Sequence, residues 1–160
     1  MPTNWGYCLV ARAANPSAVQ RTRTLVKVDG SNPLLIVGAS FDQLVGLGLI
    51  RRYLKAYEQY WPGSVAVIVP SSDIRLEYLK TANLGIAVCI SDDPELTELI
   101  SKVGPLALFN VGNDVTSLNG QVDAFELSSD LAAKLPATVI RVVDDAVEIL
   151  RPGVVAIRAE

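Results

Sequence analysis

The chain has 160 residues, half of them apolar, and a net charge of −3 with no histidine. This length suits one domain with a single core, and no apolar run reaches the roughly 20 residues of a membrane-spanning helix. The missing histidine excludes Ser-His-Asp and Cys-His catalysis and histidine metal sites. The acidic balance argues against nucleic acid as a partner.

The two cysteines, Cys8 and Cys89, both lie inside apolar runs. Free cysteine in such a setting behaves as a small apolar side chain. We therefore expect a reducing compartment, the cytoplasm, and no disulfide framework.

Residues 1–32 are predicted to form an amino-terminal β segment. Residues 7–13 and 22–28 have the composition of two strands, and residues 15–17 have that of the turn joining them. Residues 29–33 then form a strong break ahead of the core.

Residues 33–118 repeat one pattern: an apolar run, small polar residues, and a helical periodicity. Continuous apolar strands that alternate with helices predict a parallel, Rossmann-like sheet core with helices on both faces. The polar residues after each run would then gather at the carboxyl edge of the sheet, where open α/β sheets bind ligands. The apolar runs are residues 34–37, 65–69, 86–90 and 106–111.

Three helices are expected within this core. The first starts near Ser40, whose spacing to Gln43 is that of a capping box, and its apolar stripe continues to Trp61. The second covers about residues 72–83. The third is marked by Asp93 as its N-cap, followed by proline and glutamate.

Residues 119–160 are predicted to be a β-rich segment, within a single domain that covers residues 1–160. Closely spaced strands without intervening helices imply antiparallel pairing. We expect these strands to pair with the amino-terminal strands, which would either extend the sheet or form a small β layer. The expected elements are strands at 123–127, 138–143, 147–150 and 154–158 and a short helix at 130–135.

The first polar loop lacks most of a dinucleotide fingerprint, which needs three glycines. Gly38 fits, but Ser40 and Gln43 occupy the other two glycine positions, so NAD binding in the usual pose is not expected. A weaker site for a phosphate or carboxylate remains open, formed by the helix start at Ser40 and the hydroxyls of Ser71 and Ser72. The alternative is that these serines only cap helices.

Four acidic residues are candidates for a cluster that binds Mg²⁺ or Ca²⁺: Asp73, Asp92, Asp93 and Asp114. Capping and solvation account for most such loop acids, so no metal ligand is assigned and no cofactor is named. The binding residues predicted from the sequence are Gly38, Ser40, Ser71, Ser72, Asp92 and Asp114.

Residues 34–118 resemble the Rossmann-type RCK (TrkA-N) domains that regulate potassium channels. The matching features are an acid-containing turn and helix start at 90–96, an apolar strand at 106–110 and a polar loop at 112–114. The Pro-Gly-Ser step at 62–64 is similar to the Castor and Pollux branch of ion-channel domains. The resemblance implies a ligand-sensing, oligomerising module for a nucleotide or Ca²⁺.

Three functions are consistent with these features. The first is a noncatalytic Rossmann-like regulatory or assembly module that senses a small anionic ligand or a divalent cation at the carboxyl edge. Its partners would be copies of itself or a larger protein assembly, and association with a membrane protein is left open. The alternative is a purely structural, self-assembling subunit of a shell, filament or viral particle. The third is a metal-assisted small enzyme, for which the sequence offers no nucleophile–base pair.

Overall fold

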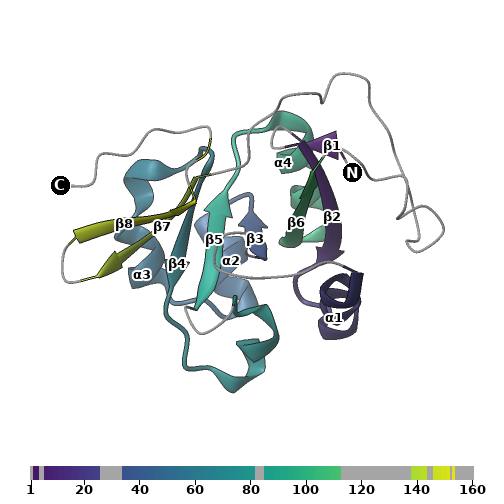
Figure 1. The fold of residues 1–160 in the computed structure, drawn as a ribbon, viewed down its shortest axis with the longest axis horizontal. Coiled ribbons are helices and arrows are strands. Elements are labelled where there is room, and N and C mark those ends of the chain that lie inside the picture. Colours follow the sequence, from purple (N-terminus) through teal and green to yellow (C-terminus); the bar gives the residue numbers. More distant parts are fainter. Residues whose placement is uncertain are drawn as a thin grey trace.

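The computed structural model describes residues 2–3, 6–25, 34–81, 85–112, 138–143, 146–151 and 153 (Figure 1). Four α-helices and two 3₁₀-helices accompany the strands in this part of the chain. The helices are α1 (Pro16–Leu25), α2 (Phe41–Leu47), α3 (Arg51–Lys55), η1 (Glu58–Tyr60), η2 (Ile74–Leu79) and α4 (Pro94–Val103). The strands are β1 (Pro2–Thr3), β2 (Gly6–Arg12), β3 (Leu35–Gly38), β4 (Val65–Val69), β5 (Ile86–Ile90), β6 (Leu106–Gly112), β7 (Thr138–Val143) and β8 (Ala146–Arg151).

The strands form one eight-stranded mixed sheet in the order β1-β2-β6-β3-β5-β4-β7-β8. β3 is parallel to β5, and β4 is parallel to β7. β4 is antiparallel to β5, however, and β6 is antiparallel to β3. The α/β class is confirmed, but the prediction that the four central strands are all parallel is wrong. An apolar run indicates that a strand is buried on both faces of the sheet, but it does not indicate the direction of that strand.

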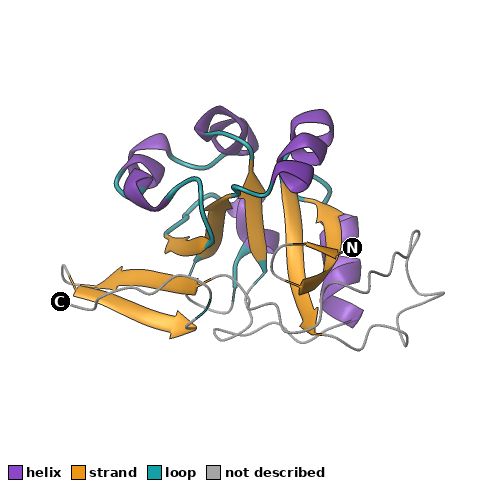
Figure 2. Ribbon diagram, turned by 90° about the horizontal axis from the view of Figure 1, so that it is seen from above, coloured by secondary structure: helices purple, strands orange, loops and turns teal. Residues whose placement is uncertain are grey.

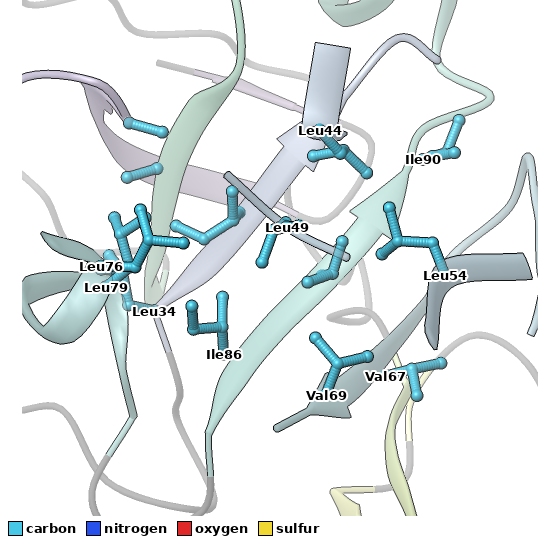
Figure 3. Packing of buried hydrophobic residues seen from close by; sticks show 14 of the residues in the cluster. Leu34, Leu44, Leu49, Leu54, Val67, Val69, Leu76, Leu79, Ile86 and Ile90 are labelled. Carbon is cyan, nitrogen blue, oxygen red and sulfur yellow. The ribbon is translucent and has the colours of Figure 1, made fainter. Parts of the chain in front are cut away.

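Burial on both faces follows from the alternation of side chains along each central strand. In β3 and the residue before it, Leu34 and Ile36 enter one core, while Leu35 and Val37 enter the other. The first core is closed by side chains of α1, α2, α3 and η2, several of which Figure 3 shows converging over β3 and β5. The second core is closed by α4. Helices therefore pack on both faces, as predicted.

The two predicted carboxyl-terminal strands that the structure describes, β7 and β8, form the expected antiparallel hairpin. They do not pair with the amino-terminal strands. The hairpin lies at one end of the sheet and β1–β2 at the other (Figure 2). The elements expected at 123–127, 130–135 and 154–158 lie outside the described residues.

Helix α1 replaces the turn expected at residues 15–17 and the part of the second strand expected at residues 22–25, while residues 26–28 lie outside the described residues. Asn15 Oδ1 accepts hydrogen bonds from Ser17 Oγ (2.9 Å) and from the Ala18 backbone N–H (3.2 Å). Pro16 is the first residue of the helix. Asn-Pro-Ser is therefore an N-cap followed by proline at the first helical position, a combination that starts helices as readily as it forms turns.

The long helix expected from Ser40 to Trp61 is divided into α2, α3 and η1. Gly48 ends α2 with a φ of 126° and donates its N–H to the carbonyls of Leu44 and Val45. Glycine adopts this backbone conformation without the steric penalty that other residues carry. The helix expected at 72–83 is only the short 3₁₀-helix η2. The cap of α4 is confirmed, since Asp93 Oδ1 accepts from the Glu95 N–H at 3.1 Å.

Arg23 joins α1 to η2 through its guanidinium group. Nη2 donates to the carbonyls of Tyr78 (2.8 Å) and Lys80 (2.6 Å), and Nε donates to the Tyr78 carbonyl at 3.2 Å. Partial burial lowers the pKa of Arg23, yet a guanidinium stays charged in proteins. These charge-assisted bonds satisfy carbonyls at the carboxyl end of η2.

We expect Arg23→Lys to lower the free energy of unfolding by about 1–2 kcal/mol, because an ammonium cannot reproduce the forked geometry. Urea denaturation followed by circular dichroism measures this loss. The matched control is Arg12→Lys, at an exposed position, which should change stability by less than about 0.5 kcal/mol. Equal losses from the two substitutions would show that the forked hydrogen bonds of the Arg23 guanidinium do not stabilise the contact between α1 and η2.

Candidate sheet-edge site

The strand directions divide the polar loops between two opposite edges of the sheet. Gly38 is paired with Ile90 in the parallel β3–β5 ladder, so loops 38–40 and 91–93 leave the same edge, which we name the first edge. Val69 at the end of β4 is paired with Ile86 at the start of β5, so loop 70–73 leaves the opposite, second edge. The carboxyl end of β6 also lies at the second edge, because β6 is antiparallel to β3.

Side chains of the protein itself fill the first edge around Gly38. A Cβ atom at Gly38 would lie 2.8 Å from Leu44 Cγ, so Leu44 occupies the space that a ligand would need. Gln43 Oε1 accepts from the Ala39 N–H (2.9 Å), and its Nε2 donates to the Ile100 carbonyl (3.0 Å). The start of α2 is therefore tied to α4, and the Ala39 N–H of the loop is already in use.

Most other polar groups of the first edge also have local partners. Ser40 Oγ accepts from the Gln43 N–H (3.3 Å) and caps α2. Ser91 Oγ accepts from the Asp93 N–H (3.0 Å), and Asp93 caps α4. Only Asp92 among these loop acids and hydroxyls is both exposed and without such a cap contact. The capping interpretation thus accounts for Ser40 and Asp93.

The Cys89 thiol lies beneath the first edge and is fully buried. Burial raises its pKa, and the nearby Asp92 carboxylate raises it further. The sulfur donates to the Gly63 carbonyl at 3.1 Å. A thiol held in its protonated form is not a nucleophile, so Cys89 is a packing residue.

Loop 70–73 at the second edge has a different character. Ser71 is half-buried and Ser72 is exposed, and neither hydroxyl bonds to any other residue that the structure describes. The capping role next to them belongs to Asp73, whose Oδ1 accepts from the Arg75 N–H at 2.9 Å. Two hydroxyls that can each donate and accept are thus available to a ligand at this edge.

The neighbouring Asp73 and Arg75 form a local ion pair. Arg75 Nη2 lies 2.8 Å from Asp73 Oδ2, and its Nε donates to Asp73 Oδ1 at 3.1 Å. The hydrogen bonds from Arg75 lower the pKa of the Asp73 carboxyl group. Asp73 is therefore ionised and engaged at neutral pH.

The six residues predicted to bind a ligand do not form one site. Gly38, Ser40 and Asp92 are at the first edge, and Ser71 and Ser72 are at the second. Asp114 lies outside the described residues, two positions after the end of β6. Their separation follows from the reversed direction of β4, which the sequence pattern did not reveal.

The predicted acidic cluster is divided in the same way. Asp73 is at the second edge, whereas Asp92 and Asp93 are at the first. Within the described ranges, no group of three or more acidic or cysteine side chains is placed to hold a metal ion. In the same ranges, no helix has the length and apolarity needed to cross a membrane.

The chain is a mixed α/β protein. Its two available serine hydroxyls follow β4, which is antiparallel to its neighbour β5, whereas the ligand-binding loops of a Rossmann dinucleotide-binding domain follow parallel strands. The model of the Sua5/YciO/YrdC family, described as "telomere recombination", matches residues 1–153. The chain belongs to the Sua5/YciO/YrdC family. A comparison with curated protein sequences gives no match.

Solved structures share this fold. P. abyssi Sua5 complexed with L-threonine has a TM-score of 0.75 and 22% identity, with 95% of this chain and 49% of that chain covered. A double variant of P. abyssi Sua5 has the same TM-score, 23% identity and coverages of 95% and 51%. E. coli YciO has a TM-score of 0.71 and 17% identity, with coverages of 96% and 81%. The chain spans about half the length of P. abyssi Sua5.

These findings correct three expectations from the sequence. The resemblance to RCK domains is wrong, because the family match covers nearly the whole chain and the RCK-like features are common to many helix starts and strands. The noncatalytic regulatory or self-assembling module is overturned by the same family match and by the shared Sua5 fold. The exclusion of nucleic acid is wrong too, since the family is described by a nucleic-acid process, and net charge averages over surfaces that differ locally.

Proposed function

We propose that this chain binds L-threonine at the second edge of the sheet and is part of an enzyme that uses it as a substrate. The observation that carries the proposal is the fold shared with P. abyssi Sua5, whose structure was determined with L-threonine, over 95% of this chain. Threonine offers an ammonium, a carboxylate and a hydroxyl, and serine hydroxyls can donate to or accept from these groups.

The second edge supports this proposal better than the first. Ser71 and Ser72 have no hydrogen-bond partner within the described part of the chain, whereas Leu44 fills the space at Gly38 and Gln43 occupies its loop donor. A ligand at Ser71 and Ser72 therefore displaces no protein–protein hydrogen bond among the described residues.

We assign Ser71 and Ser72 to the amino acid, because their hydroxyls have no partner among the described residues. We further propose that the enzyme activates the amino acid as an adenylate, with ATP as the second substrate.

Isothermal titration calorimetry of the chain with L-threonine tests the binding half. We expect binding by the unmodified chain, weaker binding of L-valine, which lacks the hydroxyl, and about tenfold or greater loss of affinity in Ser71→Ala/Ser72→Ala. The matched control, Ser40→Ala/Asp92→Asn at the first edge, should retain full affinity. No binding of L-threonine, or a loss confined to the control variant, would contradict the proposal.

Pyrophosphate release from ATP in the presence of bicarbonate tests the enzymatic half, because a threonylcarbamoyl adenylate takes its added carbon from bicarbonate and its formation liberates pyrophosphate. We expect release that depends on L-threonine and falls in the Ser71→Ala/Ser72→Ala variant. Threonine binding without threonine-dependent release would overturn the enzymatic half and leave the binding half standing.

A further inference from the structure

One positive charge lies beside the available serines at the second edge. Arg75 is the one cation in residues 70–79, and its side chain is 84% exposed. Its guanidinium group is held by the Asp73 carboxylate, with Nε donating to Oδ1 (3.1 Å) and Nη2 donating to Oδ2 (2.8 Å). Because Asp73 directly follows Ser72 in the chain, the guanidinium group is fixed against the loop that carries the two hydroxyls.

The guanidinium group of Arg75 has donors to spare. It carries five N–H donors, of which one on Nε and one on Nη2 are bonded to Asp73. The other three, two on Nη1 and one on Nη2, bond to no residue that the structure describes. The next cation along the chain differs, since Lys80 lies 3.0 Å from Glu77 and is largely covered. Arg75 can therefore accept a second carboxylate without releasing Asp73.

The stability of the fold does not account for this arrangement, because an exposed ion pair between near neighbours contributes little to it. What the pair provides is a cation whose position is set before a ligand arrives, which lowers the conformational entropy that binding costs. The neighbouring hydroxyls of Ser71 and Ser72 are neutral. A ligand with both hydroxyl-sized polar groups and one negative charge matches this set of side chains.

We propose that Arg75 binds the carboxylate of the amino acid, while Ser71 and Ser72 contact its other polar groups. This inference rests on the proposed binding of L-threonine at the second edge. The free donors of Nη1 and Nη2 diverge from those that hold Asp73, and two such donors match the two oxygens of a carboxylate. The site therefore selects a free amino acid, because a threonine inside a peptide has no carboxylate to offer.

Isothermal titration calorimetry of the chain with L-threonine and with L-threoninamide tests this inference. The amide keeps the ammonium, hydroxyl and methyl groups, and at about pH 6 the ammonium of both ligands is protonated, so the ligands differ only in the carboxylate. We expect the amide to bind about tenfold more weakly than L-threonine. Arg75→Gln should lower the affinity for L-threonine about tenfold and that for the amide by less than about twofold. Arg75→Lys keeps the charge without the fork and should give an intermediate loss.

The matched control is Arg51→Gln, which removes another exposed arginine from an ion pair with an aspartate, Asp42 of α2. It should leave both affinities within about twofold. Equal losses for the two ligands in Arg75→Gln, or an equal loss of L-threonine affinity in Arg51→Gln, would overturn the role of Arg75 and leave threonine binding standing. No binding of L-threonine by the unmodified chain would overturn the proposed function and this inference with it. Thermal melts verify that each variant is folded.

Discussion

Gly85→Ala is expected to lower the free energy of unfolding by roughly 3 kcal/mol or more. Gly85 has a φ of +122°, and a Cβ atom there would lie 2.4 Å from the backbone oxygen of Val69. The β4–β5 ladder would have to separate at this point, because a backbone carbonyl cannot turn away as a side chain can. Urea denaturation measures the loss.

Two further glycines separate the causes of that loss. Gly104 also has a positive φ, +90°, but no atom lies within 4 Å of the position that a Cβ would take there, so Gly104→Ala should cost only about 1–2 kcal/mol of backbone strain. Gly46 lies inside α2 with equally open space, and Gly46→Ala should raise stability by about 0.5–1 kcal/mol. If Gly85→Ala lowered the free energy of unfolding no more than Gly104→Ala does, the close contact with the Val69 carbonyl would add nothing to the loss of stability.

Phe109→Ala is expected to lower the free energy of unfolding by about 3–5 kcal/mol. Phe109 lies on β6, has no exposed surface and belongs to the first core. Its removal leaves a cavity between β6 and the helices of that core, and the neighbouring side chains belong to a rigid sheet that cannot collapse into it.

The matched control for this substitution is Phe41→Ala. Phe41 is only half-buried and makes an edge contact with Trp61, with ring centroids 6.3 Å apart, so we expect a loss of about 1–2 kcal/mol. Equal losses at the two positions, measured by urea denaturation, would contradict the placement of Phe109 at the centre of the core.

Much of the fold could be predicted because apolar runs and helix caps are local signals. The runs correctly located β3, β4, β5 and β6, and Asp93 followed by proline located the start of α4. The prediction of a turn at residues 15–17 was wrong, because asparagine followed by proline and serine begins helices as well as turns. The first core helix was predicted too long, because its apolar stripe continues beyond Gly48, the residue that ends α2.

Strand direction could not be predicted, because it depends on which strands become neighbours. The segment between β4 and β5 is long enough for a parallel crossover, yet η2 leads back into an antiparallel strand. That reversal decides the candidate site, since it moves Ser71 and Ser72 to the edge opposite Ser40 and Asp92. The residue types were informative about ligand binding, but their grouping required the topology. That the chain is a single cytoplasmic domain stays a prediction.

The central claim, that L-threonine binds at the second edge, is tested most directly by nuclear magnetic resonance titration of the nitrogen-15-labelled chain. We expect the amide signals of Ser71, Ser72 and Ile74 to shift progressively with added L-threonine, while those of Gly38, Ser40 and Asp92 stay in place. Shifts confined to Gly38, Ser40 and Asp92, or no shifts at saturating L-threonine, would contradict it.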